Sequence, residues 1–177
     1  MQPVELKRCT PADIPQLRQV ALQSYHEHYL YLWTEDKYVQ WYTDISFGEQ
    51  SLQRQMNEPG TDFFLIQTNA ENVGFLKTIT NYAPDNNSPG KSLYLERIYI
   101  IKRATNQGIG AKAVQMIIDK AKEEHLETIW LKSMDSSKAV QFYEKMGFKI
   151  VKTEQIPFEG FKDEYRNIHL MILQLFN

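Results

Sequence analysis

The chain has 177 residues, the length of a single domain, and 42% of them are hydrophobic, which is enough to bury a sizeable core. Its 20 lysines and arginines against 22 aspartates and glutamates give a net charge of −2, which argues against a nucleic-acid-binding domain, and its single cysteine, Cys9, excludes an internal disulfide and a cysteine zinc cluster. No apolar run reaches the ~18 residues of a membrane span, and residues 1–7 lack an apolar signal core, so we expect a cytoplasmic protein without membrane contact.

The first third of the chain predicts one strand followed by helices. Thr10 and Pro11 mark a helix start, because threonine caps a helix N-terminus and proline fits the first helical position. Apolar residues then recur at helical spacing as far as Ser24, and Pro59-Gly60 ends the helical stretch. The predicted elements are a strand over residues 4–7, a helix that begins at residue 10, a second helix start at 34–37 and a helix over 47–56.

From Phe63 onward, the pattern changes to strands alternating with helices. The apolar run at Phe63, a turn at residues 69–72 and a returning strand predict a hairpin, and residues 84–90 are loop formers. The predicted elements are strands over 63–66, 73–79 and 93–101, a helix over 108–124, a strand over 128–131, a helix over 137–146, and strands over 148–153 and 168–175. Without a repeat or linker, this order predicts one α/β domain over residues 1–177.

The most informative segment, residues 103–111, joins the predicted strand 93–101 to the following helix. A helix N-terminus presents unpaired N–H groups and a positive dipole end, and glycines let a phosphate approach the backbone closely. Two other phosphate motifs fail, because Gly110 is followed by Ala111 instead of the P-loop lysine, and Ala113 stands where the dinucleotide fingerprint needs glycine. Taken alone, the segment is read equally well as a plain tight turn.

Two segments together resemble the motifs of the GNAT acetyltransferases. Residues 103–111 resemble motif A, and residues 139–148 resemble motif B. The resemblance is specific from about residue 93 to residue 148. It implies the GNAT fold, a mixed, mostly antiparallel twisted sheet of about six to seven strands flanked by helices. It also implies acetyl-CoA as cosubstrate and no metal.

The same resemblance implies which residues hold the cofactor. The end of the strand 93–101 is implied to splay from its neighbour, so that its backbone groups bind the pantetheine arm and polarise the acetyl carbonyl. Thr105 stands where glutamine or arginine is common in the family, and Ser136 stands where an asparagine often contacts the cofactor. The implied cofactor-binding residues are Ile98, Tyr99, Ile100, Arg103, Thr105, Asn106, Gln107, Gly108, Ile109, Gly110, Ala111, Ser136 and Lys145.

Tyr143 is the candidate general acid. Acetyl transfer to an amine is helped by a proton that reaches the leaving thiolate. Tyr143 matches the motif-B tyrosine whose phenol is implied to protonate the departing sulfur. The alternative is a core aromatic residue on the inner face of the last helix, beside Phe142.

Glu96 is the candidate general base. Strand alternation predicts that Glu96 shares a face with Tyr94, Ile98 and Ile100, and a glutamate on an apolar face costs free energy unless something uses it. In polyamine acetyltransferases, which the chain resembles, a glutamate at this offset from motif A is taken as the base, directly or through water. The alternative is a structural ion pair with a lysine or arginine on the neighbouring strand.

The resemblance implies that the first helices form the acceptor wall. Between Tyr25 and Phe47, aromatic residues are interleaved with carboxylates, and both kinds of group attract ammonium ions. This composition suits a polyamine whose distal ammonium is held by Asp36 or Asp44, although helix packing explains the aromatics as well. The candidate substrate-binding residues are Tyr25, His28, Trp33, Asp36 and Trp41.

Three segments resemble the bacterial PaiA-type spermidine/spermine acetyltransferases: residues 92–93 with 95–100, residues 129–131, and residues 142–148. The expected function is therefore acetyl transfer from acetyl-CoA to a primary amine of a polyamine or similar small molecule. Two alternatives stay open, a protein or peptide N-acetyltransferase and a non-catalytic CoA-binding regulatory module. The expected partner is a small amine, and the sequence leaves a homodimer open.

Overall fold

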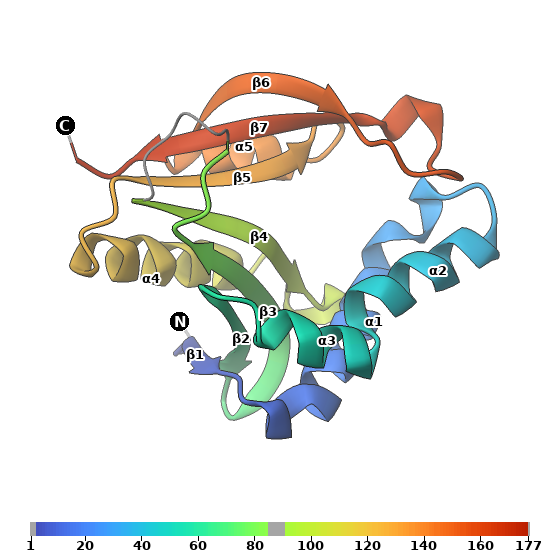
Figure 1. Ribbon diagram of the computed structural model, residues 1–177, viewed down its shortest axis with the longest axis horizontal. Helices are drawn as coiled ribbons and strands as arrows, with labels where there is room; N and C mark the ends of the chain where they lie inside the picture. Colours follow the sequence, from blue (N-terminus) through green and yellow to red (C-terminus); the bar gives the residue numbers. More distant parts are fainter. Residues whose placement is uncertain (1–2, 85–90, 177) are drawn as a thin grey trace.

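The computed structural model describes residues 3–84 and 91–176, which form a seven-stranded sheet in the order β1-β2-β3-β4-β5-β7-β6 (Figure 1). All neighbouring strands are antiparallel except β4 and β5, which are parallel. The predicted mixed, mostly antiparallel sheet is thereby confirmed. The strands are β1 (Glu5–Arg8), β2 (Thr61–Thr68), β3 (Glu71–Thr80), β4 (Ser92–Ile100), β5 (Thr128–Met134), β6 (Lys149–Gln155) and β7 (Asn167–Gln174).

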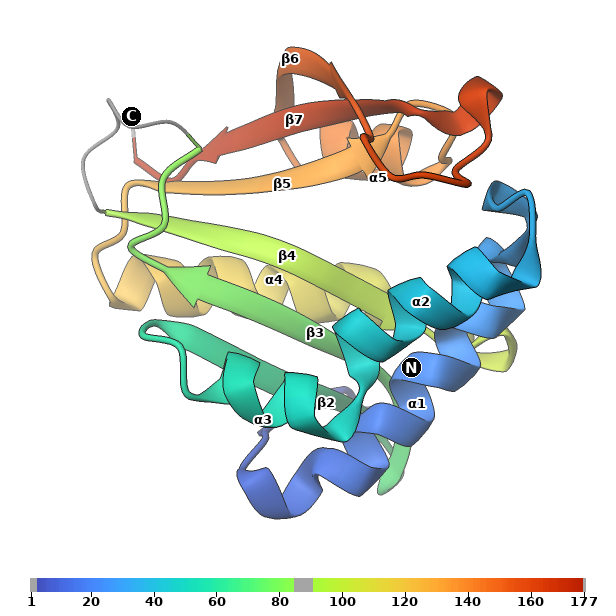
Figure 2. The same ribbon diagram turned by 45° about the vertical axis from the view of Figure 1, so that its right-hand side comes forward.

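Helices cover both faces of this sheet, with α2 and α3 in front of it and α4 behind it in both views (Figures 1 and 2). The α-helices are α1 (Ile14–Tyr29), α2 (Asp36–Phe47), α3 (Glu49–Met56), α4 (Ile109–Glu123) and α5 (Ala139–Lys145). Short 3-10 turns are η1 (Pro11–Asp13), η2 (Leu30–Leu32), η3 (Lys102–Ala104) and η4 (Asp163–Tyr165). None of the helices in the described ranges is long and apolar enough to cross a membrane.

Two differences between the predicted and the observed helix boundaries have a clear structural cause. Thr10 and Asp13 form a capping box around the 3-10 turn η1, and the α-helix begins one turn later, at Ile14. The predicted helix over residues 47–56 is the end of α2 followed by α3, because Gly48 has an extended backbone that separates them. The predicted loop over residues 84–90 lies outside the described residues, apart from Pro84.

The sheet divides in its middle. β4 pairs with β5 only through Ser92–Tyr94, opposite residues 128–130, whereas it stays paired with β3 as far as Ile100. Beyond Tyr94 the two parallel strands therefore diverge. In this half of β4, the backbone groups that would face β5 have no partner strand there.

A β-bulge at Glu96 corrects the predicted strand alternation. Lys77 pairs with Arg97 and Thr78 pairs with Leu95, so Glu96 is an extra residue in β4. A bulge of this kind places one residue out of phase with the rest of the strand. Glu96 therefore shares its face with Arg97, whereas Ile100 packs near Gly110 of α4 on the opposite face. The expectation that Glu96 shares a face of the strand with Ile100 was wrong.

Candidate active site

A cavity of about 810 Å³ opens where β4 and β5 diverge. One side is formed by β4 over residues 94–99, and the other by β5 over residues 131–134. Tyrosines of α1 and α2, polar residues of α3, Tyr143 of α5 and Phe158 after β6 also contribute to the lining. The divergence of the two strands leaves the space for the cavity, and the fold brings residues far apart in the sequence together around it.

The loop before α4 presents its backbone as a cradle. Gly108 has φ +77, a conformation that favours glycine, and a side-chain carbon built there would meet no atom within 4 Å. The first bond of the helix is donated by the Lys112 N–H to the Gly108 carbonyl, over 3.1 Å. The preceding amides, of Ile109, Gly110 and Ala111, have no intrahelical partner. This open backbone at the N-terminus of a 15-residue helix fits a pyrophosphate.

The side chains of this loop bind the loop itself. The Thr105 hydroxyl donates to the Lys102 carbonyl at 2.8 Å, and the Gln107 amide donates to the Arg103 carbonyl at 2.8 Å. The Arg103 guanidinium lies 3.0 Å from the Glu71 carboxylate, and both side chains are largely exposed. What the loop offers a ligand is therefore chiefly its backbone.

Helix α1 fixes the junction between β4 and this loop. The Lys102 N–H donates to the Glu27 carboxylate at 2.5 Å, and His28 Nε2 lies 3.0 Å from the Ile100 carbonyl oxygen. Because a carbonyl only accepts, Nε2 of His28 must carry the proton of this bond. His28 thus holds the end of β4, and it is absent from the cavity lining, as is Ile100, whereas Ile98 and Tyr99 line it.

Tyr143 lies in the cavity wall with its ring packed and its hydroxyl available. The side chain is 7% exposed, and its ring lies 5.0 Å from that of Phe142 and 5.6 Å from that of Phe148. Within residues 3–84 and 91–176, its hydroxyl has no hydrogen-bond partner. Burial raises the pKa of Tyr143 above its usual value, so the phenol stays protonated and can donate.

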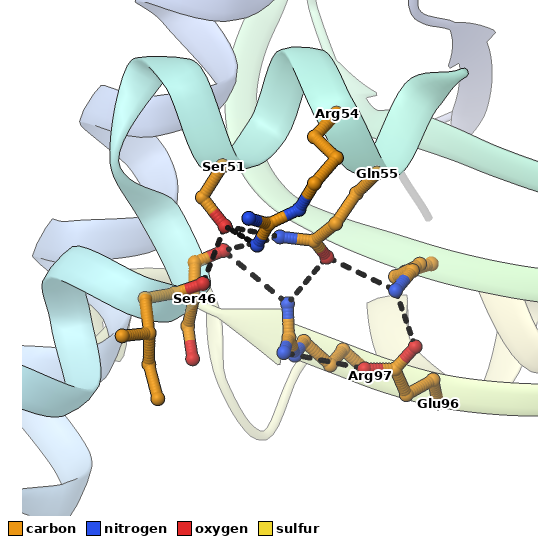
Figure 3. Close-up of polar contacts among 8 residues, drawn as sticks. Ser46, Ser51, Arg54, Gln55, Glu96 and Arg97 are labelled. Carbon is orange, nitrogen blue, oxygen red and sulfur yellow. Dashed lines mark hydrogen bonds and ion pairs between the residues drawn. The ribbon is translucent and has the colours of Figure 1, made fainter. Parts of the chain in front are cut away.

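Glu96 lies between two cations in the same cavity (Figure 3). One carboxylate oxygen lies 2.5 Å from Lys77 Nζ on β3, and the other lies 3.2 Å from the Arg97 guanidinium. Only 3% of Lys77 is exposed. Burial lowers the pKa of Lys77, and the Glu96 carboxylate opposes that shift. This is the ion pair with a neighbouring strand that the alternative interpretation of Glu96 requires.

Gln55 of α3 connects this ion pair to the helices. Its side-chain oxygen accepts from Lys77 Nζ at 3.0 Å and from Arg97 at 3.3 Å. Its amide nitrogen donates to the Ser46 carbonyl and to the Ser51 hydroxyl, both at 3.1 Å. Every polar group of Gln55 therefore has a partner, which fixes the positions of both cations.

The aromatic wall is packed closely against the other end of the cavity. Trp33 Nε1 donates to the Tyr25 hydroxyl at 2.8 Å, and the Tyr25 ring stacks on that of Tyr42 at 5.0 Å. Tyr25, Trp33 and Tyr42 line the cavity. Trp41 is 43% exposed and lies outside the lining, where its ring meets those of Trp33 and Phe158 edge-on. The wall is thus partly packing, as the alternative interpretation has it, and partly accessible to a ligand.

A comparison with known protein families identifies the fold. The model of the acetyltransferase (GNAT) family matches residues 18–148. The chain belongs to this family. A curated relative, an uncharacterized N-acetyltransferase in the pepI 3' region of Lactobacillus delbrueckii subsp. lactis, is 24% identical over 107 residues. The match covers 60% of this chain and 62% of that relative, less than two thirds of its length.

Solved structures share the GNAT fold over nearly the whole chain. The PaiA N-acetyltransferase from Thermoplasma acidophilum, in complex with coenzyme A, has a TM-score of 0.73 at 18% identity, covering 97% of this chain and 99% of its own. A spermidine N-acetyltransferase SpeG variant from Vibrio cholerae has a TM-score of 0.68 at 16% identity, covering 97% and 94%. A ribosomal-protein-alanine N-acetyltransferase from Brucella melitensis has a TM-score of 0.66 at 18% identity, covering 96% and 99%.

Not all candidate site residues of this GNAT protein come together. Asp36 and Asp44 of α2 are absent from the cavity lining, and Asp44 instead accepts a hydrogen bond from Gln40 at 2.8 Å. Ser136 and Lys145 are exposed near the two ends of α5, also outside the lining. The residue after Ser136, Ser137, does line the cavity.

Sequence reasoning missed the residues around Glu96, which are Lys77, Gln55 and Arg97. One of them had a signal in the sequence, because Lys77 interrupts the apolar run of the strand predicted over residues 73–79. A lysine in such a run is rarely buried without a partner. Gln55 had no comparable signal, since it follows from the packing of α3 on the sheet.

Proposed function

We propose that this protein transfers an acetyl group from acetyl-CoA to a primary amine of a small molecule, with Tyr143 as the general acid. The observation that carries the proposal is Tyr143, a buried residue that lines the cavity where β4 and β5 diverge and whose hydroxyl has no hydrogen-bond partner within residues 3–84 and 91–176. Two further features favour the use of acetyl-CoA: the open backbone before α4 fits its pyrophosphate, and the divergent half of β4 has backbone groups available for its pantetheine arm.

Each part of the site has a task in this reaction. Acetyl-CoA supplies the acetyl thioester when it is bound. The amides of Ile109, Gly110 and Ala111 hold the pyrophosphate, and backbone groups of Ile98 and Tyr99 orient the arm and polarise the carbonyl. The amine nitrogen attacks the thioester carbonyl carbon and loses a proton as the carbon–nitrogen bond forms. The carbon–sulfur bond breaks, and the Tyr143 hydroxyl donates its proton to the departing sulfur.

Two roles for Glu96 compete. As a base, its carboxylate takes the proton of the attacking ammonium, directly or through one water. As a structural anion, it holds Lys77 and Arg97 in place, and its two short ion-pair contacts support this role. The variant Glu96→Gln distinguishes the two roles. If Glu96 is the base, the variant loses most of its rate near neutral pH and recovers part of that rate at higher pH, where more of the amine is already neutral. A wild-type pH–rate profile would assign Glu96 to structure.

A polyamine acceptor is the second candidate. The tyrosine wall of the cavity attracts ammonium groups, and Glu58 lines the same cavity without an ion pair within the described ranges. Against it, the carboxylates expected to hold the distal ammonium, Asp36 and Asp44, lie outside the lining. Glu154, which does line the cavity, is already paired with Lys132 at 2.5 Å.

The function is tested by the release of free thiol from acetyl-CoA with a panel of primary amines. The panel contains spermidine, a monoamine with a neutral tail and a peptide with an unblocked N-terminus. Amine-dependent thiol release, with the acetylated product seen by mass spectrometry, is the expected result. Tight acetyl-CoA binding with no turnover on any amine would point instead to a non-catalytic CoA-binding module, and turnover of the peptide alone to a peptide acetyltransferase.

A further inference from the structure

We propose that the acceptor of this protein is a primary amine that also carries a carboxylate, and that Arg54 and Arg97 bind this carboxylate. The inference rests on the proposed function and names the class of its acceptor. It differs from the polyamine candidate in the sign of the charge at the far end of the acceptor.

The first observation is the charge balance at the inner end of the cavity. Among the described residues, Lys77 and Arg97 form ion pairs with one carboxylate, that of Glu96, and their hydrogen-bond partners besides it are the neutral oxygens of Gln55 and Ser46. Only 4% of the Lys77 side chain and 13% of the Arg97 side chain are exposed. Charges so far from water are costly unless they are paired. Two buried cations and one carboxylate leave one positive charge without a counterion in direct contact.

Arg54 adds a third cation from α3. It lines the cavity, and its guanidinium donates to the Ser51 hydroxyl at 3.3 Å. Within residues 3–84 and 91–176, no carboxylate lies within ion-pair distance of it. Glu58, one turn further along the chain, also lines the cavity and acts on Lys77 electrostatically. Three cations against two carboxylates still leave an excess of one positive charge.

The other end of the cavity is balanced differently. Lys132 lies 2.5 Å from the Glu154 carboxylate, which also binds Lys152 at 2.8 Å outside the cavity lining. The cation that lines the cavity there thus has a carboxylate in direct contact. The excess of positive charge is therefore local to the end formed by α3, β3 and β4.

The geometry suits a carboxylate. Figure 3 shows Arg54 from α3 and Arg97 from β4 reaching toward the same place, where Gln55 and the Ser46 carbonyl lie between them. A guanidinium presents a planar fork of N–H donors that matches a carboxylate. Besides its ion pair with Glu96, Arg97 donates to the neutral oxygens of Gln55 and Ser46 at 3.3 and 3.4 Å. These two hydrogen bonds are long, and a carboxylate would form a shorter one.

The position relative to the chemistry is also suitable. Arg97 and Glu96 lie on β4, and Tyr143 lies on α5, across the divergence of the two parallel strands. An acceptor that spans the cavity can thus direct its amine toward Tyr143 and its carboxylate toward the two arginines. The Glu96 carboxylate would attract the ammonium group of the acceptor and repel its carboxylate, so that the acceptor binds in one orientation.

The test compares acceptors of equal chain length with different end groups: aminobutyrate, aminobutanol and diaminobutane, followed by the same three end groups on a six-carbon chain. We expect kcat/KM for the carboxylate member to exceed that of the alcohol and the diamine about tenfold, the gain expected of one charge-assisted hydrogen bond. Aminoethyl phosphate is added to separate carboxylate from phosphate recognition, and a preference for it over every amino acid would contradict the carboxylate assignment.

Variants of Arg54 test the assignment of the site, because Arg54 is exposed on α3 and its replacement leaves the buried ion pairs intact. Arg54→Gln should bring the carboxylate-to-alcohol ratio close to one, and Arg54→Glu should shift the preference to the diamine. The matched control is Arg8→Gln, since Arg8 is a surface arginine that pairs with Asp62 at the far end of the sheet. It should keep the wild-type ratio.

Two outcomes separate this inference from the proposed function. Acetylation of all three amines without preference for the carboxylate would overturn the inference and leave the function standing. If no amine is acetylated, the function fails, and calorimetric binding of aminobutyrate to the CoA complex decides the inference. Binding that is weakened by Arg54→Gln and kept by Arg8→Gln supports it, and absence of binding overturns it.

Discussion

The cofactor loop and the inner end of the acceptor cavity achieve binding in opposite ways. The loop before α4 is exposed and offers its backbone, and its ion pair, Arg103 with Glu71, has both side chains more than 60% exposed. At the inner end, charged side chains form the surface, and those of Lys77 and Glu96 are only 4% and 19% exposed. A backbone cradle accepts the same phosphate in any family member, whereas a side-chain network can be specific for one acceptor.

The largest expected difference between the two regions is in stability, and it is measured by removing one carboxylate from each. Glu96→Ala leaves Lys77 and Arg97 buried without a counterion, so it should lower the free energy of unfolding by about 3–5 kcal/mol. Glu71→Ala breaks only an exposed pair and should cost about 0–1 kcal/mol. Urea denaturation of both variants measures the difference. Equal losses would show that the inner network is as solvated as the loop.

A substitution of Gly108 tests the backbone cradle. Gly108→Val forces a β-branched residue into φ +77 and puts its methyl groups in the open space where a phosphate would lie, so acetyl-CoA affinity should fall about tenfold. Gly108→Asn is the matched control, because asparagine tolerates this conformation, as Asn106 does at φ 62. Isothermal calorimetry gives both affinities. If the valine variant folds and binds as tightly as wild type, the cradle is elsewhere.

The smallest effect concerns the balanced end of the cavity. Hydrogen bonds from Lys132 and then Lys152 lower the pKa of Glu154 to about 2, from an ordinary value of 4.5. Because the folded pKa lies below the unfolded one, Glu154 stabilises the fold above about pH 4.5, and this contribution is lost as the pH falls toward 2. Stability curves should therefore fall less steeply in this range for Glu154→Gln than for wild type. Parallel curves would mean that Glu154 contributes nothing.

Much of the fold could be predicted from the sequence, because it depends on local patterns. The apolar spacing in α1 predicted its buried face, and Ile14, Leu17, Val20, Ala21 and Ser24 are all buried. Glycine spacing located the turn before α4, where Gly108 needs its left-handed backbone. In each case the relevant residues lie within a few positions of one another.

The inner end of the cavity could not be predicted in the same way. The bulge at Glu96 depends on the register between β3 and β4, which strand alternation alone does not contain. The contact between Gln55 and Lys77 joins residues 22 positions apart, and that between Ser46 and Arg97 joins residues 51 positions apart. Asp36 and Asp44 were expected at the acceptor because their segment is rich in aromatic and acidic residues, but both lie outside the cavity lining.

The most direct test of the proposed function is single-turnover acetyl transfer by Tyr143→Phe. Phenylalanine keeps the ring contacts with Phe142 and Phe148 and removes only the hydroxyl that faces the cavity. General acid catalysis contributes ~10²–10⁴-fold, so we expect the rate to fall at least about tenfold while acetyl-CoA affinity stays unchanged. A variant that transfers acetyl at the wild-type rate would make Tyr143 a packing residue and contradict the proposed mechanism.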